Sequence, residues 1–179
     1  GTDSDMSRDD VPTFLAKLGC VHSVGPVRDL KGGTAQALAR LDAFVNGSLA
    51  DYGAGRADIV ARSVSMLSPY LHFGQISPLD IYQAVESADA PSQRRASYVE
   101  EMLVRRELAV NFVHYAPDYD SFTTLPGWAR ETLAQHRDDP RESVYSPAEL
   151  EAGETGDPYW NAAMREMKLT GYLHNHLRM

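Results

Sequence analysis

Residues that cap helices stand directly before a proline at several places in the chain, among them Ser-Pro at 77–78 and 146–147, and Asp-Pro at 157–158. Serine and aspartate side chains accept hydrogen bonds from the free N–H groups of a helix start, and proline suits the first helical position. No stretch shows the run of alternating β-branched residues that indicates a strand. The sequence therefore predicts an all-α fold of helices joined by short loops.

Apolar residues recur at helical spacing in three segments, and this spacing predicts the buried face of each helix. The segments open at Thr34, at Pro78 and, after a cap at Ser92, as the longest helix at about 93–114. One inward position of the longest helix carries a charge, which is unusual and hints at a site. The residues expected to face the core are Leu38, Leu41, Phe44, Leu49, Leu79, Tyr82, Val85, Tyr98, Met102, Arg105 or Arg106, Ala109, and Phe112 or Val113.

The composition is that of one globular domain, with 43% apolar residues in a chain of 179. A single cysteine, Cys20, excludes an internal disulfide and favours a reducing, intracellular compartment. No apolar run approaches the roughly 20 residues that cross a bilayer, so no membrane partner is expected. We interpret residues 1–10 as a flexible start or a cloning remnant, and residues 1–30 as a partly flexible segment or linker.

The net charge of −8 counts against nucleic-acid binding as a property of the whole chain, because dedicated binders are usually basic. It does not exclude a basic patch on one face. Arg94, Arg95, Arg105 and Arg106 form a candidate patch. The alternative is a solvated helix face with ion pairs, and the sequence leaves both open.

Three local patterns carry little chemistry. The GxG at 52–56 lacks the preceding strand and the third glycine of a dinucleotide site, so we interpret it as a turn. His174 and His176 are two residues apart, which splits them across a helix, and no acid or cysteine cluster supports a metal site. Cys20 has no evident histidine partner, so a nucleophilic role is not expected.

The segment SMLSPY at 65–70 places two serines before a proline that can begin a helix. Serine hydroxyls and the free N–H groups of a helix start together suit an anion. The simpler alternative is an ordinary N-cap. These residues alone do not name a ligand.

One longer string is specific enough to indicate a family. LSPYLHFGQISP at 67–78 closely resembles the flavin-binding segment of class II cyclobutane pyrimidine dimer photolyases, of the photolyase/cryptochrome family. Three further stretches agree, in the family's order. They are EEMLVRRELAVNF at 100–112, the pieces WARETL, YS and LEAG between 128 and 153, and the pieces DPYWNAA, TGYLH and LRM between 157 and 179.

The resemblance implies that residues 31–179 are the helical FAD-binding domain of such a photolyase, incomplete at its C-terminal end and without the antenna domain. It implies FAD as the cofactor, bent into a U shape. Hydroxyls and N–H groups at 65–68 suit a diphosphate. By carry-over, the cofactor-binding residues are Tyr52, Ser65, Leu67, Ser68, Tyr98 and Arg178.

The same resemblance implies residues for the substrate and the chemistry. Glu101 matches the active-site carboxyl, which stays protonated in a dry pocket and hydrogen-bonds a base carbonyl of the lesion. Its alternative is a surface glutamate paired with Arg105. Trp160 matches a tryptophan that relays electrons to FAD, or is simply a core aromatic. The residues expected to contact DNA are Arg56, Glu101, Arg105, Asn175 and Met179.

The implied activity is light-driven repair of cyclobutane pyrimidine dimers, flipped out of damaged DNA, by electron transfer from reduced FAD. That makes the parent protein a deoxyribodipyrimidine photolyase, a carbon–carbon lyase. We expect it to act as a monomer and without a metal. Arg105 stands where some relatives carry an aromatic, and Asn175 where class II members more often have glycine. The alternatives are a cryptochrome-like photoreceptor and, for this chain alone, a helical fragment without activity.

Overall fold

The computed structural model describes residues 11–19, 25–27, 29–61 and 63–178. The chain divides into two compact units, Gly1–Leu30 and Lys31–Met179. In the first unit, the described helix is α1 (Val11–Lys17). Residues 1–10, Cys20 and Met179, all discussed above, lie outside the described residues.

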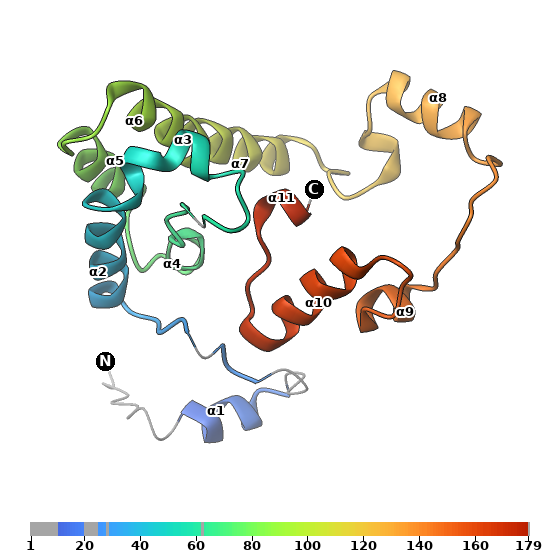
Figure 1. Ribbon diagram of the computed structural model, residues 1–179, viewed down its shortest axis with the longest axis horizontal. Coiled ribbons are helices and arrows are strands. Elements are labelled where there is room, and N and C mark those ends of the chain that lie inside the picture. The colour runs from blue at the N-terminus through green and yellow to red at the C-terminus, as the bar shows by residue number, and fades with distance from the viewer. Residues whose placement is uncertain (1–10, 20–24, 28, 62, 179) are drawn as a thin grey trace. The chain divides into compact units, whose positions relative to one another are not determined.

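The second unit is helical throughout, and its described residues contain no strand (Figure 1). The all-α prediction is therefore confirmed. In chain order the helices are α2 (Thr34–Val45), η2 (Ser48–Asp51), α3 (Tyr52–Gly55), α4 (Ser68–His72), α5 (Pro78–Glu86), α6 (Ser92–Val99), the π-helical turn η3 (Glu100–Arg105), α7 (Arg106–Tyr115), η4 (Phe122–Thr124), α8 (Gly127–Gln135), α9 (Pro147–Ala152), α10 (Pro158–Thr170) and α11 (Asn175–Arg178).

The three proline-marked helix starts are confirmed. The Ser77 hydroxyl accepts a hydrogen bond from a backbone N–H at the start of α5, and Asp157 accepts two at the start of α10. Ser146 forms a reciprocal capping box with Glu149 at the start of α9. The expected cap at Ser92 is wrong. The residue before α6 is Pro91, and no side-chain cap forms there, because Ser92 is already the first helical residue.

The core lies within the first half of the second unit. Every buried apolar residue among those described falls between positions 37 and 102. Three aromatic rings meet at its centre: Phe44 lies 4.7 Å from Tyr98 and 6.0 Å from Tyr52, and Tyr52 lies 5.1 Å from Tyr98, measured between ring centroids. The core apolar residues are Ala37, Leu41, Phe44, Leu49, Tyr52, Leu67, Tyr70, Ile76, Ile81, Val85, Tyr98 and Met102.

In α2 and α5, three residues expected in the core are exposed instead: Leu38, Leu79 and Tyr82. Helix α2 packs through positions 37, 41 and 44, so the small residue Ala37 takes the buried position and Leu38 points away. The buried residues of helix α5 are Ile81 and, one turn later, Val85. Both helices bury a narrower stripe than their apolar residues suggest.

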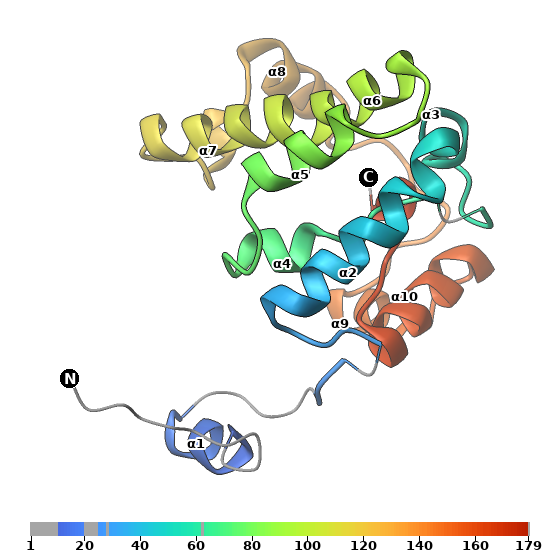
Figure 2. The same cartoon turned by 90° about the vertical axis from the view of Figure 1, so that its left-hand side faces the viewer.

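The longest predicted helix is one continuous rod, formed by α6, η3 and α7 (Figure 1 and Figure 2). Its buried face ends at Met102, because no residue of α7 is buried. The expected burial of Arg105, Arg106, Ala109, Phe112 and Val113 is therefore wrong. A π turn holds more residues than an α turn, so residues beyond it rotate away from the face that α6 sets up.

None of the helices in the described part of the chain is long and apolar enough to cross a membrane.

Candidate functional site

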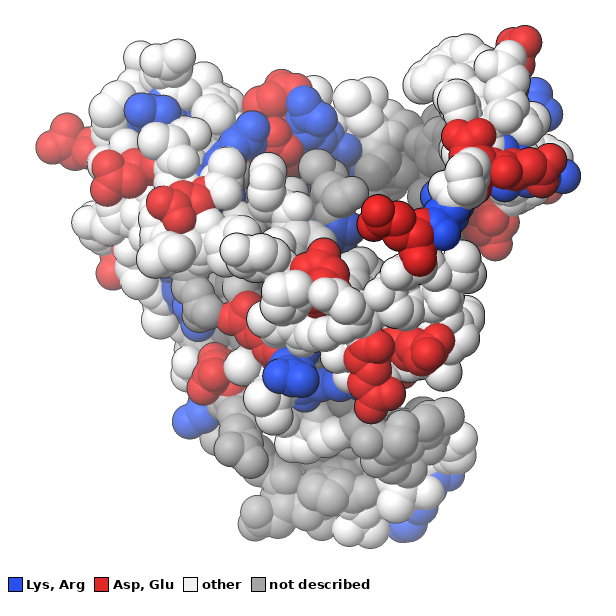
Figure 3. Space-filling view, turned by 45° about the vertical axis from the view of Figure 1, so that its right-hand side comes forward, with Lys and Arg blue, Asp and Glu red and all other residues white. Residues whose placement is uncertain are grey.

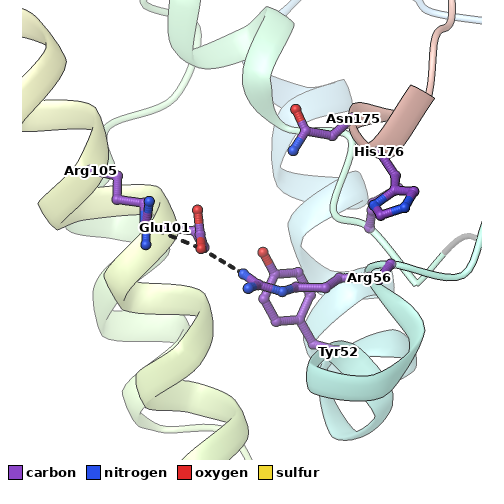
Figure 4. Close-up of a pocket in the computed structure, with 8 residues that line it drawn as sticks. Tyr52, Arg56, Glu101, Arg105, Asn175 and His176 are labelled. Atoms are coloured by element: carbon purple, nitrogen blue, oxygen red, sulfur yellow. Dashed lines mark hydrogen bonds and ion pairs between the residues drawn. The ribbon is translucent and has the colours of Figure 1, made fainter. Parts of the chain in front are cut away.

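A cavity of about 340 Å³ opens between α3, η3 and α11. Such a volume falls at the lower end of the range for small-molecule pockets. Figure 4 shows Glu101 and Arg105 on one side of it and Asn175 and His176 on the other. The residues that line the cavity are Tyr52, Arg56, Ala57, Val64, Glu101, Arg105, Asn175 and His176.

Arg56 reaches the cavity because α3 is held close to its neighbours. A side chain at Gly53 would overlap the guanidinium of Arg94, with its Cβ 2.9 Å from Cζ. A Cβ at Gly55 would lie 2.6 Å from the Cβ of Ser63. The GxG segment, which we interpreted as a loop turn, forms the short helix α3. Its two glycines let Arg94 and Ser63 lie close to the backbone just before Arg56, which lines the cavity.

Glu101 lies between two arginines. Arg56 Nη1 donates a hydrogen bond to Glu101 Oε1 at 2.6 Å, and Arg105 Nε lies 3.3 Å from the same oxygen. The hydrogen bond to Glu101 raises the pKa of Arg56, so this guanidinium stays charged. The Glu101 side chain is 33% exposed, which is wetter than the dry pocket expected for a protonated carboxyl. The ion pair between Glu101 and Arg105, which was the alternative for this glutamate, is present, and Glu101 also pairs with Arg56.

The π turn supplies both Glu101 and Arg105. π-helical turns cost hydrogen-bond geometry and often occur at functional sites. The sequence carried no signal for this turn, which would have required knowing the helix register on both sides.

Two tyrosines lie at or next to the cavity, since Tyr52 lines it and Tyr98 packs against Tyr52. Burial raises the pKa of Tyr98 to about 12, although its hydrogen bond with Ser65 lowers it. Burial also raises the pKa of Tyr52, while the contact with Arg56 lowers it. The Arg56 guanidinium lies 5.9 Å from the centre of the Tyr52 ring, a cation–π contact. Both phenols are therefore neutral donors at ordinary pH.

The serine segment has an unusual backbone. Met66 adopts a φ of 56°, a conformation that residues other than glycine rarely take. Ser65 Oγ accepts a long hydrogen bond, 3.4 Å, from the N–H of Leu67, which is buried. Helix α4 begins at Ser68 without a side-chain cap. The simple N-cap interpretation of these serines is therefore wrong, and the hydroxyl of Ser68 is not used for capping.

The remaining predicted residues lie at different distances from the cavity. Asn175 lines it, and its Oδ1 accepts a hydrogen bond from Arg178, which does not line it. Trp160 lies on α10 and donates from Nε1 to the carbonyl of Leu150, so it joins α10 to α9 and does not line the cavity. His176 also lines the cavity, whereas its sequence pattern had raised only a metal site, because a histidine beside a suspected site carries no spacing signal of its own.

The four candidate arginines do not form one patch. Arg105 lines the cavity, whereas Arg94 packs on Gly53 and Arg106 pairs with Glu107. Arg95 donates to the carbonyls of Glu86 and Ala88 at the end of α5. Figure 3 shows basic side chains scattered among acidic ones on the face drawn. Arg105 and Arg106 form ion pairs, as the alternative left open above expects, whereas Arg94 and Arg95 contact a glycine and backbone carbonyls.

No group of three or more histidine, cysteine or acidic side chains in the described ranges is placed to hold a metal ion. His174 is fully buried, and its Nδ1 accepts a hydrogen bond from the N–H of His176. This bond fixes the start of α11, where Asn175 and His176 lie. His174 thus helps to position the wall of the cavity.

The chain is similar in sequence to several photolyases, although no protein-family model matches it. A deoxyribodipyrimidine photo-lyase of Methanothermobacter thermautotrophicus is 47% identical over 150 residues, covering 83% of this chain and 33% of that protein. One from Potorous tridactylus is 38% identical over 168 residues, covering 92% and 31%. Cryptochrome-2 of Arabidopsis thaliana is 31% identical over 142 residues, covering 78% and 23%.

The fold is also similar to a solved structure. A bacterial class III photolyase from Agrobacterium tumefaciens superposes with a TM-score of 0.63 at 25% identity, covering 82% of this chain and 29% of that one. The chain spans a third or less of the length of each protein named here. These similarities support the photolyase/cryptochrome family for this chain, and its fold is the helical domain fold of that family.

Proposed function

We propose that the complete protein repairs cyclobutane pyrimidine dimers in DNA with light, as a class II photolyase, and that residues 31–179 belong to its FAD-binding domain. One observation carries this proposal most directly. Arg56, Glu101, Arg105 and Asn175 were assigned to the substrate from separate sequence motifs, and they line one cavity. Arg56 and Glu101 are 45 positions apart in the sequence, and Glu101 and Asn175 are 74 positions apart, so local spacing alone would not bring them together.

The residues present fit FAD by their chemistry. Ser65, Ser68 and the backbone N–H groups around Leu67 offer hydrogen-bond donors for a diphosphate, and the missing cap at α4 leaves Ser68 available. Tyr52 and Tyr98 stay neutral and add apolar surface beside this segment. Arg178 completes the proposed set. FAD, when bound and reduced, supplies the electron that opens the dimer after light absorption.

The cavity residues suit a flipped-out lesion. Arg56 and Arg105 are guanidinium groups, which bind phosphates of the DNA backbone well, and Arg105 can also stack on a base. Glu101 and Asn175 offer hydrogen bonds to base edges, and Met179 adds an apolar contact in the proposal. Extrusion of the lesion costs less than that of a normal base pair, because a dimer is already poorly stacked and paired.

Trp160 has a separate proposed role as a step in electron transfer to FAD. Its contact with Leu150 holds the indole in one orientation, which a relay requires. Its position also serves packing between α9 and α10. A Trp160→Phe variant loses this hydrogen bond but keeps an aromatic ring between α9 and α10, and it should slow the photoreduction of FAD, measured by flavin absorption under illumination.

A cryptochrome-like photoreceptor is the second candidate, favoured by the similarity to Cryptochrome-2. The two functions differ in substrate, since a photoreceptor need not prefer damaged DNA. Retention of Arg56 and Glu101 at the cavity favours repair. For the isolated chain we propose no activity and no retention of FAD after gel filtration.

The test is the light-dependent loss of dimers from an irradiated thymidine oligonucleotide, using the complete protein with reduced FAD. We expect repair in the light and none in the dark. Glu101→Gln should slow repair strongly, while Glu100→Gln, an equal charge change on the neighbouring exposed residue, should not. A protein that retains reduced FAD but removes no dimers would refute the repair proposal. Equal binding to damaged and undamaged DNA would favour the photoreceptor.

A further inference from the structure

We propose that Glu101 is a selectivity element that occupies Arg56 in the ligand-free cavity and so excludes DNA that offers only a phosphate. The inference rests on the proposed function and concerns how the same cavity chooses its ligand. It follows from the contact between Arg56 and Glu101, which join α3 to the π turn across the cavity.

The geometry gives Arg56 an internal anion as its partner. The 2.6 Å separation from Glu101 Oε1 is that of a charge-assisted hydrogen bond. Arg105 approaches the same oxygen, so both guanidinium groups converge on Oε1. Figure 4 shows the other carboxylate oxygen turned away from Arg56. One carboxylate oxygen therefore takes both guanidinium contacts, and the other is turned away from Arg56.

The charges set what can enter. Arg56 and Arg105 bring two positive charges to the cavity and Glu101 brings one negative charge. A DNA phosphate that approaches Arg56 meets the Glu101 carboxylate at the same guanidinium and is repelled by it. The Arg56 side chain is 40% exposed, so solvent moderates this repulsion without removing it.

A lesion base changes the balance. A ligand that brings a neutral N–H donor together with a phosphate can hydrogen-bond the carboxylate while its phosphate takes Arg56. The Glu101 carboxylate then exchanges Arg56 for the N–H donor of the ligand. It is not left unpaired, and an unpaired carboxylate would cost affinity. An undamaged strand, whose bases remain stacked, offers the phosphate without the donor. The internal ion pair therefore weakens binding of undamaged DNA more than binding of a flipped lesion.

The experiment measures the affinity of the complete protein for two double-stranded oligonucleotides of the same sequence, with and without one thymine dimer. Glu101→Gln removes the competing charge while keeping the shape of the side chain. We expect undamaged DNA to bind about fivefold more tightly, as removal of an exposed ion pair allows, and dimer-containing DNA to bind more weakly. Glu100→Gln makes the same change in net charge and should alter neither affinity.

A double-mutant cycle assigns the gain to Arg56. In an Arg56→Gln background, Glu101→Gln should no longer strengthen binding of undamaged DNA, because the guanidinium that it would free is gone. Flavin absorption and circular dichroism of each variant establish that the fold and the cofactor are retained.

Opposite changes in the two affinities support the proposal. The proposal is overturned if Glu101→Gln changes both affinities in the same direction or leaves the affinity for undamaged DNA unchanged. It is also overturned if Glu101→Gln still strengthens binding of undamaged DNA in the Arg56→Gln background. The undamaged oligonucleotide needs no repair, so this arm remains informative if the protein proves to be a photoreceptor. Failure of repair with a clear gain in the undamaged arm would refute the proposed function and leave the ion-pair competition standing.

Discussion

The helices before and after residue 105 are stabilised in different ways. The N-terminal helices, α2 to η3, bury the core, whereas α7, α8, α9 and α10 contain no buried residue. In these C-terminal helices even large apolar side chains are exposed, such as Trp128 at 74% and Tyr159 at 80%. Side-chain caps mark the starts of two of them, through the capping box of α9 and through Asp157 at α10. Packing between distant residues orders the first region, whereas short-range hydrogen bonds define the starts of α9 and α10 in the second.

The candidate site depends on both regions. Tyr52, Arg56 and Glu101 are fixed from beneath by the core, through the aromatic contacts of Tyr52 and the close approach at α3. Asn175 and His176 reach the cavity from the end of the C-terminal segment, where buried His174 holds the start of α11. One wall of the cavity is therefore packed on the core, and the other is held through the hydrogen bond of His174.

The largest contrast should come from matched leucines. Leu41 is 5% exposed in α2 and Leu133 is 53% exposed in α8, and both lie inside helices. Leu41→Ala should lower the free energy of unfolding by about 3 kcal/mol, because it leaves a cavity in the core. Leu133→Ala should change it by less than about 0.5 kcal/mol. Urea unfolding followed by circular dichroism measures both.

Equal losses for the two leucines would break the comparison. They would mean that α8 is packed in solution to the same degree as α2. A separate early transition for the C-terminal helices would sharpen it, because the two regions would then unfold as independent units.

The sequence predicted helix starts better than helix faces. Caps such as Asp157 depend on residues a few positions apart, so they could be recognised locally. Exposure of Leu79 and Phe112 depends on which neighbours the helix meets, and apolar spacing carries no information about that.

The same limit applies to the site. The resemblance selected Arg56 and Glu101, and the structure brings them together at one cavity. It could not predict that they form an ion pair, since that contact depends on a π turn and on two glycines that let α3 approach. His176 was missed for the same reason, because its place in the wall comes from the position of α11.

A second contrast appears at alkaline pH. Burial raises the pKa of Tyr98 from 10.0 to about 12 in the folded chain. An unfolded chain therefore ionises this phenol first, so folding should become less favourable as the pH rises from 10 towards 12. The loss should reach about 2 kcal/mol by pH 12. The free energy of unfolding, measured by urea titration at several pH values, gives this slope.

Two phenylalanine variants isolate the effect. Tyr98→Phe should flatten the dependence on pH above 10, even though it also loses the hydrogen bond with Ser65 and is less stable at neutral pH. Tyr159→Phe, on exposed α10, should leave the slope unchanged. An unaltered slope in Tyr98→Phe would show that this phenol is hydrated in solution, against its burial in the core.

The smallest contrast compares two glycines, whose replacement by alanine should change the free energy of unfolding in opposite directions. Gly55→Ala places a methyl group 2.6 Å from the Cβ of Ser63, so α3 or its neighbour must shift, at a cost of about 1.5 kcal/mol. Gly127→Ala, at the first position of α8, meets nothing within 4 Å and should stabilise slightly, because alanine favours the helix.

The Gly55 variant also tests the link between core and cavity. Arg56 follows directly in the sequence, so a shift of α3 should weaken its ion pair with Glu101 as well as the fold. Binding of undamaged DNA by the complete protein should then change in Gly55→Ala and stay constant in Gly127→Ala. If Gly55→Ala destabilises the fold without changing DNA affinity, Arg56 is held by Glu101 alone and not by the packing of α3. Core packing would then fix the backbone of α3 but not the Arg56 side chain, and the ion pair with Glu101 would position the guanidinium.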